Sequence, residues 1–321
     1  MHSLKSRKFK RIIAQLQKFF NRYKVRTPNF IIIFTIIFPK KYFYLKTVDF
    51  ELTQCYNHNV RMNYHFFDYK YNISGFESDL FSTAHLVFII LAFLSVILLA
   101  IFARKAKYDH ISVFLKVISI VVVVLEITKI SWESYYDITT GRGFNKEGLI
   151  PVYTCSLFIY TLLFAAWGKG KVKDVALSFL TTVGLVCGAI GVVYCNGLNY
   201  YPFWTFGAFY SLFFHYSMLS VGVFLLASGY KQLSVKDIYK SWIPVVMLAV
   251  IAIPIDYIMQ TDYMQLYSAS GVPLMESLAE VLAAHNLRFI FTIIMLLAYM
   301  PMAAAVVGVV KLITLVTNYK R

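Results

Sequence analysis

The chain has 321 residues, of which 59% are hydrophobic and only 15% charged, and its mean hydropathy is +0.63. This balance excludes an ordinary soluble globular protein, in which about a quarter of the residues are charged. The four cysteines show neither CxxC spacing nor a neighbouring His-rich pattern, so neither a disulfide framework nor a bound metal is predicted.

Positive charge is concentrated at the N-terminus, where nine Lys or Arg lie within residues 1–28. Apolar residues recur among them at helical spacing, which predicts a basic amphipathic helix. The partner expected for such a helix is an anionic membrane surface. The alternative is a solvated tail that helps to orient the protein. Without a recognisable nucleic-acid-binding module, no nucleic-acid partner is expected.

The segment at residues 30–45, "FIIIFTIIFPKKYFYL", is apolar but interrupted by Pro39, Lys40 and Lys41. It is either an irregular eighth span or a segment lying in the membrane interface. We therefore predict an N-terminal extension over residues 1–75 and a transmembrane helix bundle over residues 76–321.

Apolar runs long enough to cross a bilayer recur after this extension, because lipid cannot satisfy exposed backbone polar groups and favours helices. The fold class predicted is all-α, a polytopic membrane helix bundle of about seven spans. These spans are expected near residues 84–103, 111–130, 150–168, 175–195, 203–229, 242–260 and 287–313.

Basic residues alternate between the connecting loops. Several Lys or Arg lie in each of the loops 104–110, 169–174 and 230–241, whereas loops 196–203 and 261–286 have none. Because basic loops stay on the cytoplasmic side, we predict a multi-pass protein of the cell membrane with a cytoplasmic C-terminus.

Four polar side chains fall inside the expected spans: Glu126, Cys155, His215 and Asp256. Each lies 13 to 15 residues from the cytoplasmic end of its span, which places all four about 20 Å from the inner surface, in the outer half of the bilayer. Ionisable groups at that depth are costly and indicate function. A thiol beside an imidazole fits covalent catalysis, with the histidine taking and returning a proton while a carboxylate orients it.

Each of these residues also has a structural interpretation. A cysteine in an apolar helix is commonly a packing residue, and His215 is also placed to hydrogen-bond across a helix interface. Glu126 has Lys129 one turn away as a partner, and Asp256 lies toward the outer interface. A different function, transport of a small solute or ion, would use Glu126, His215 and Asp256 as a relay.

Several motifs resemble a known family in the same order along the chain. Ile150–Cys155, "IPVYTC", resembles a Leu-Pro-Leu-His-x-Cys motif, with Tyr153 at the histidine position. Upstream, "FSTAHLVF" with His85 resembles the first span of that family, and Glu126 with Lys129 resembles a Glu-x-x-Lys pattern in its second. Downstream, "YPFW…FFHYSML" resembles the segment that bears the intramembrane histidine, matching His215. "IDYIMQTDYMQLY" resembles an Asn-Tyr…Gly-x-Asn-Tyr-Met stretch. Together they are similar to the YwaF-like bacterial integral membrane proteins and their animal relatives, the transmembrane-protein-164 group.

The animal relatives are cysteine-centred acyltransferases that move fatty acyl groups between phospholipids. The resemblance implies a lipid acyltransferase or acyl-ester hydrolase with membrane lipids as partners and no cofactor. Cys155 would be the nucleophile and His215 the base, with their reactive atoms within about 4 Å.

In this interpretation Glu126 or Asp256 would orient His215. Tyr153, Tyr257 or Tyr263 would donate hydrogen bonds to the developing oxyanion. Three departures from the motifs, Tyr153, Asp256 and Asp262, leave open a changed substrate or a loss of activity.

Overall fold

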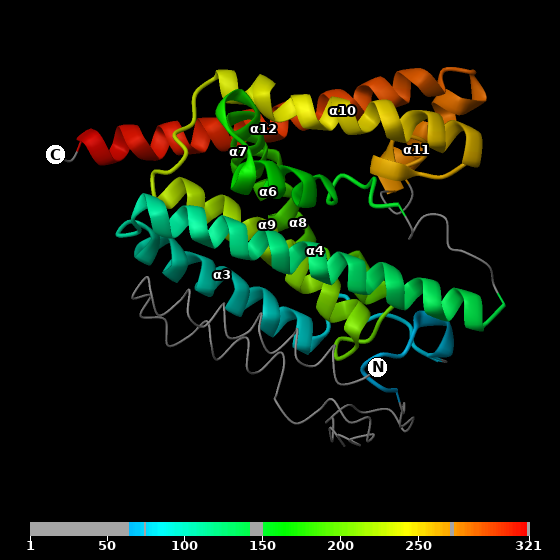
Figure 1. Ribbon diagram of the computed structural model, residues 1–321. Helices are drawn as coiled ribbons and strands as arrows, with labels where there is room; N and C mark the ends of the chain where they lie inside the picture. The colour runs from blue at the N-terminus through cyan, green and yellow to red at the C-terminus, as the bar shows by residue number, and fades with distance from the viewer. Residues whose placement is uncertain (1–63, 74, 142–149, 270–272, 320–321) are drawn as a thin grey trace. The chain divides into compact units, whose positions relative to one another are not determined.

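The computed structural model describes residues 64–73, 75–141, 150–269 and 273–319 (Figure 1). The chain divides into two compact units, Met1–Val60 and Arg61–Arg321. The first unit lies outside the described residues, and with it the basic segment 1–28 and the apolar segment 30–45. In the second unit every regular element within these ranges is a helix.

Six stretches of the described chain are long and apolar enough to cross a membrane, which confirms a polytopic helical membrane bundle. The 21 residues of α3 span about 31 Å, close to the thickness of a hydrocarbon core. The six are α3 (Thr83–Ala103), α4 (Tyr108–Thr139), the α7–α8 stretch (Gly170–Thr181 and Val183–Val193), α9 (Phe206–Ala227), α10 (Lys236–Met259) and α12 (Arg288–Tyr319).

The span expected at 150–168 is wrong in its length. Helix α6 covers only Leu157–Trp167, or 11 residues, and reaches about 16 Å, half of a hydrocarbon core. The residues before it form turns rather than helix. Pro151 supplies no backbone N–H and disfavours helix at the residue before it. The apolar sequence did not distinguish a full span from a short helix preceded by a buried turn.

The span expected at 175–195 is interrupted at Thr182, whose φ of −127° and ψ of −94° separate α7 from α8. The hydroxyl of Thr182 donates to the Ser178 carbonyl at 2.6 Å, and that of Thr181 donates to the Leu177 carbonyl at 2.7 Å. Such bonds from side chain to backbone bend helices. The break redirects α8 toward α9, against which it packs.

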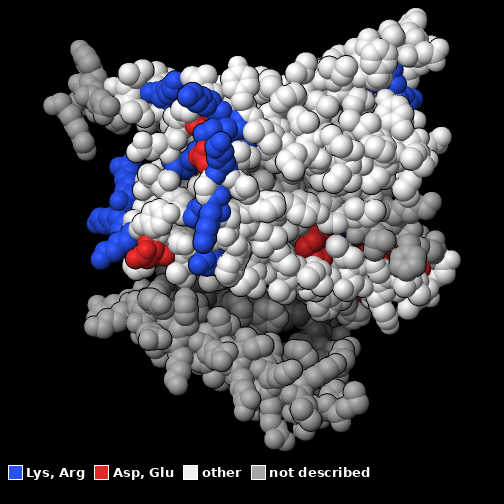
Figure 2. Space-filling model, turned by 45° about the horizontal axis from the view of Figure 1, so that its top comes forward, with Lys and Arg blue, Asp and Glu red and all other residues white. Residues whose placement is uncertain are grey.

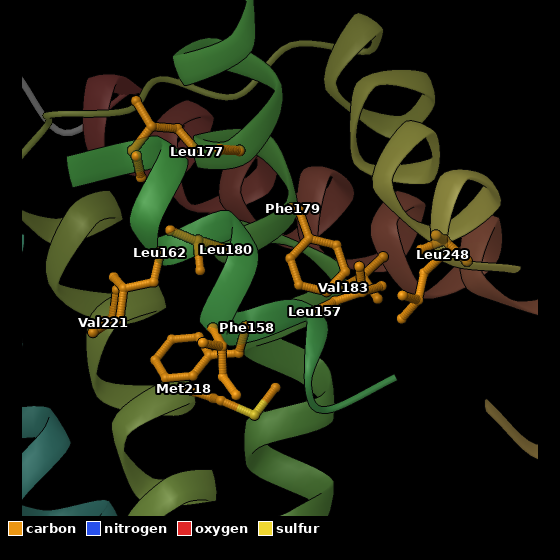
Figure 3. Packing of buried hydrophobic residues seen from close by; sticks show 14 of the residues in the cluster. Leu157, Phe158, Leu162, Leu177, Phe179, Leu180, Val183, Met218, Val221 and Leu248 are labelled. Atoms are coloured by element: carbon orange, nitrogen blue, oxygen red, sulfur yellow. The ribbon is translucent and has the colours of Figure 1, made fainter. Parts of the chain in front are cut away.

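The α7–α8 stretch is mostly buried, whereas α3 and α12 are mostly exposed. Helix α6 contacts α4 and α7, and α9 contacts α3, α4 and α8. Figure 3 shows Phe158 of α6 and Met218 of α9 meeting in the apolar core that these helices share. The exposed apolar faces of α3 and α12 are those expected to contact lipid.

The outer loop expected at 261–286 contains one further helix, α11 (Pro273–Ala284), which packs against α12. Its 12 residues are too few to span a membrane. Of the expected extension, residues 64–73 pack against α4 and α9. The Phe66 carbonyl accepts a hydrogen bond from Phe206 N at 2.6 Å, and the Phe67 carbonyl accepts one from Trp132 Nε1 at 2.9 Å.

Candidate active site

Cys155 lies in the turn that leads into α6. The amides of Ser156, Leu157 and Phe158 donate to the carbonyls three residues earlier, at 2.9, 3.2 and 3.0 Å. The Tyr160 hydroxyl, one turn into α6, donates back to the Pro151 carbonyl at 3.1 Å. These bonds fix the turn on both sides of Cys155 and hold its side chain at the buried start of the helix.

The structure brings Cys155 and His215 together. The Cys155 Sγ and the His215 Nε2 are 3.4 Å apart, which confirms the expected proximity. His215 Nδ1 lies 2.8 Å from the Ser211 carbonyl oxygen. A carbonyl can only accept, so Nδ1 carries the proton and Nε2 presents a lone pair to the thiol. The arrangement allows the imidazole to take the thiol proton.

The Ser211 carbonyl, and not a carboxylate, is the group found at His215 Nδ1. Sequence reasoning missed this partner, because a backbone carbonyl leaves no sequence signal. Ser211 has a second contact, in which its hydroxyl accepts a hydrogen bond from the Cys195 thiol at 3.1 Å. Cys155, Cys187 and Cys195 are all free thiols.

Glu126 is buried on α4, where its carboxylate accepts a hydrogen bond from the Tyr210 hydroxyl. Its other oxygen lies 3.9 Å from Lys129 Nζ, which confirms the expected pairing one helical turn away. Lys129 also lies 3.4 Å from Glu133. This carboxylate is therefore part of a polar row along α4 that faces α9.

Asp256 is fully buried near the end of α10. Its Oδ1 accepts hydrogen bonds from Thr261 Oγ1 at 2.9 Å and from Tyr263 N at 2.7 Å. Asp262 similarly accepts bonds from the amides of Tyr267 and Ser268, both at 2.9 Å. The two acidic residues that depart from the motif thus shape the turn at 261–268.

Of the three expected tyrosines, Tyr153 lies in the cysteine segment, Tyr257 lies on α10 and Tyr263 lies in that turn. The Tyr153 and Tyr263 rings pack together with centroids 5.1 Å apart, which joins the cysteine segment to the turn after α10. Tyr257 is 43% exposed, and its hydroxyl lies 3.4 Å from Thr292 Oγ1. Tyr263 is therefore next to the cysteine segment, whereas the Tyr257 hydroxyl lies toward α12.

Sequence reasoning missed a hydroxyl pair adjacent to Cys155. Thr154 Oγ1 and the Tyr299 hydroxyl of α12 are 2.6 Å apart. The same tyrosine hydroxyl donates to the Met264 carbonyl at 3.4 Å. One signal was available, because Tyr299 is a polar aromatic residue in the otherwise apolar run "IIMLLAYMPM".

The six membrane-length apolar stretches of the described residues pack together with a buried apolar core, and they define a multi-pass integral membrane protein. Its sequence matches the TMEM164 family over residues 80–316, and the chain belongs to that family. The matched range contains Cys155, His215, Glu126 and Asp256. The comparisons with curated proteins and with solved structures gave no match.

Proposed function

We propose that this protein is a cysteine-dependent lipid acyltransferase or acyl-ester hydrolase that acts through Cys155 and His215. One observation carries the proposal: the thiol lies 3.4 Å from Nε2 of an imidazole whose other nitrogen is held at 2.8 Å by the Ser211 carbonyl. A nucleophile, a base and a group that orients the base form the arrangement that covalent acyl transfer requires.

In the first half of the reaction, His215 Nε2 takes the thiol proton as Sγ attacks the carbonyl carbon of a lipid ester. The C–S bond forms and the C–O bond of the ester breaks, which leaves a thioester on Cys155. The departing alkoxide of the lysolipid takes the proton from His215 and leaves as an alcohol.

In the second half, a hydroxyl group of another lipid, or water, attacks the thioester carbonyl and gives its proton to Nε2. The C–S bond breaks, and the proton returns to the Cys155 sulfur. The product is a new ester if the acceptor is a lipid alcohol, or a free fatty acid if it is water. Hydroxyls near the cysteine turn, above all those of Tyr153 and Tyr263, are our candidates for stabilising the oxyanion.

Lipid is the substrate class that fits the surroundings of the pair. The apolar faces of α3, α4 and α12 are exposed, and in a membrane they are covered by acyl chains. Within the TMEM164 family we place the chain with the YwaF-like bacterial members. The same proposal puts it in the cell membrane, with a cytoplasmic C-terminus and residues 1–28 on an anionic surface.

The test is to trap an acyl-thioester on the full-length protein with a phospholipid that carries a labelled acyl chain. We expect a label that is released by neutral hydroxylamine and maps to the peptide containing Cys155. Cys155→Ala and His215→Ala should lose it. Cys187→Ala is the matched control, because Cys187 is a second partly buried thiol packed against the same core, and it should keep the label. Equal labelling of all four proteins, or no label on the wild type, would refute the proposal.

A further inference from the structure

The imidazole of His215 lies directly against the backbone of α8 at Gly191. A Cβ atom at this position would stand 1.9 Å from His215 Cδ2, 2.3 Å from Cγ and 2.6 Å from Nε2. Each distance is far below van der Waals contact. Only glycine fits at residue 191 while the ring stays where it is.

The other edges of the ring also have neighbours. The Ser211 carbonyl lies at Nδ1, the Cys155 sulfur lies at Nε2, and the Phe214 ring packs edge-on with its centroid 6.0 Å away. Gly191 therefore faces the Cδ2 edge of the ring, which is next to the nitrogen that contacts the thiol. A side chain there would force the ring to shift or rotate, and the contacts that such a shift would disturb are those of Nε2 with Sγ and of Nδ1 with the Ser211 carbonyl.

The close approach of α8 to α9 continues one turn earlier at Gly188. A Cβ there would lie 2.5 Å from Leu219 N and 2.8 Å from Met218 Cβ. Small residues at such spacing let two membrane helices approach until their backbones touch. At Gly188 the neighbours are mainly backbone and packing atoms, whereas at Gly191 all three nearest atoms belong to the imidazole.

We propose that Gly191 is a positioning residue: its missing side chain forms the recess that holds the His215 imidazole against the Cys155 thiol. This inference rests on the proposed function for its catalytic meaning. The contact between thiol and imidazole, which the inference explains, is observed in the structure whether or not the protein transfers acyl groups. A displacement of about 1 Å is enough to break a 3.4 Å contact to sulfur and to cost a large part of the rate that depends on it.

Two other glycines separate this role from packing in general. At Gly222 of α9, a Cβ would lie 2.7 Å from the Leu180 carbonyl and 2.9 Å from Leu185 Cβ, so alanine there strains helix packing without touching the imidazole. At Gly308 of α12, nothing lies within 4 Å of an added Cβ. Gly222→Ala is the control for packing damage, and Gly308→Ala is the control for the substitution itself.

The experiment measures alkylation of Cys155 by iodoacetamide in the full-length protein, reconstituted in phospholipid nanodiscs. Mass spectrometry of the peptide that contains Cys155 gives the rate at about pH 7 and at about pH 10, where hydroxide ionises a much larger fraction of a thiol without help from a base. The alkylation ratio is the rate at about pH 7 divided by the rate at about pH 10. For Gly191→Ala and for His215→Ala we expect this ratio to fall about 10-fold or more, since a positioned base contributes about 10²–10⁴-fold. Gly222→Ala and Gly308→Ala should keep the wild-type ratio.

A wild-type ratio in Gly191→Ala, or an equal loss in Gly222→Ala, would overturn the inference. If Gly191→Ala is too unstable for the alkylation measurement, the inference is tested by comparing its melting temperature with that of the double variant Gly191→Ala/His215→Ala. Removing the ring removes the clash, so the double variant should melt at a higher temperature than Gly191→Ala alone. A double variant no more stable than the single one would overturn the inference as well.

Acyl-thioester trapping and the alkylation ratio test the proposed function and this inference separately. If no acyl-thioester forms but Gly191→Ala still loses the alkylation ratio, the acyl chemistry fails and the positioning stands. If the thioester forms and the ratio is unchanged in Gly191→Ala, the positioning fails and the acyl chemistry stands.

Discussion

Lys and Arg side chains gather on one side of the described residues in the view of Figure 2. Where α7 meets the start of α10, such charges are matched in a network. Asp237 is almost fully buried and lies 2.7 Å from Lys231 Nζ, while Asp174 lies 2.5 Å from both Lys231 and Lys240. Ser178 donates to Asp237 as well, at 2.7 Å.

The Cys155 region, by contrast, joins its helices with neutral groups. Thiol meets imidazole, the imidazole donates to a carbonyl, and Thr154 pairs with the Tyr299 hydroxyl. In the charged network each carboxylate accepts several bonds, which suits it to fixing helices in place. In the Cys155 region the bond between the thiol and Nε2 carries a proton that can move. The difference separates a part of the molecule that stabilises the fold from a part suited to chemistry.

The largest effect expected is that of His215→Ala on the region around Cys155. Loss of the base should lower the rate of acyl transfer about 10²–10⁴-fold. It should leave the protein folded, with a melting temperature lowered by the cavity that the missing ring leaves beside Gly191 and Phe214. The measurement is the initial rate with labelled phospholipid. A rate within about 3-fold of wild type in a folded variant would show that His215 is not the base and that the Cys155 region is not reactive in the way proposed.

Asp237→Ala should have the opposite signature. Removing Asp237 leaves Lys231 with Asp174 as its remaining carboxylate and takes the buried acceptor from Ser178, which costs about 1–3 kcal/mol. Thermal unfolding in detergent is expected to shift strongly, while the pH 7 to pH 10 alkylation ratio of Cys155 stays at the wild-type value. Asp109→Ala, at an exposed acidic residue in the first turn of α4, is the control and should melt as the wild type does. A changed ratio in Asp237→Ala would show that the two regions are coupled.

Tyr299→Phe tests the hydroxyl pair beside the cysteine. Loss of its bond to Thr154 should cost about 1 kcal/mol of stability. Because Thr154 adjoins the nucleophile, we expect a loss of similar size from transition-state stabilisation, a reduction of about 5-fold in acyl transfer. Tyr216→Phe removes a similar hydroxyl pair, to Ser95 Oγ at 2.8 Å, from the α3–α9 interface. That control should lose stability to a similar extent and keep its activity. Equal activities in the two variants would mean that the Thr154 contact only supports packing.

The smallest effect is expected from Glu126→Gln, which preserves the shape of the side chain and an acceptor for Tyr210 while removing the charge that faces Lys129. We expect the rate of acyl transfer to change by less than about 3-fold, because the loss of one partly buried ion pair changes the free energy by only a small amount. A larger loss, together with proton or cation flux in proteoliposomes that disappears in the variant, would favour the transport interpretation over the acyl one.

The sequence predicted the parts of this molecule that depend on apolar length and on depth. Helices α3 and α9 begin and end within a few residues of the expected bounds, because nothing interrupts their apolar runs. The meeting of Cys155 and His215 was predicted from their similar distances, 13 and 14 residues, to the expected cytoplasmic ends of their spans. Depth alone does not specify the direction in which a side chain points. Glu126 was assigned the same depth, yet it faces Tyr210 and Lys129.

What escaped prediction depends on backbone geometry and on contacts between distant segments. The break at Thr182 comes from hydroxyls that bond to the preceding turn, a tendency that threonine shows in many unbroken helices. The recess at Gly191 and the carbonyl of Ser211 act through a missing side chain and a main-chain atom. Neither has a residue-level pattern that single-sequence reasoning can recognise.

The short helix α6 has a consequence for solvent exchange. Peptide groups that are not in a helix survive at membrane depth only when protein covers them, and here the turn from Tyr153 to Ser156 lies beneath the Tyr263 and Tyr299 side chains. The Ser156 amide, which donates to the Tyr153 carbonyl within this turn, should therefore exchange with deuterium as slowly as the amides of a helix, although it is outside one. Binding of a lipid that parts this covering would register as faster exchange at this amide before any product is released.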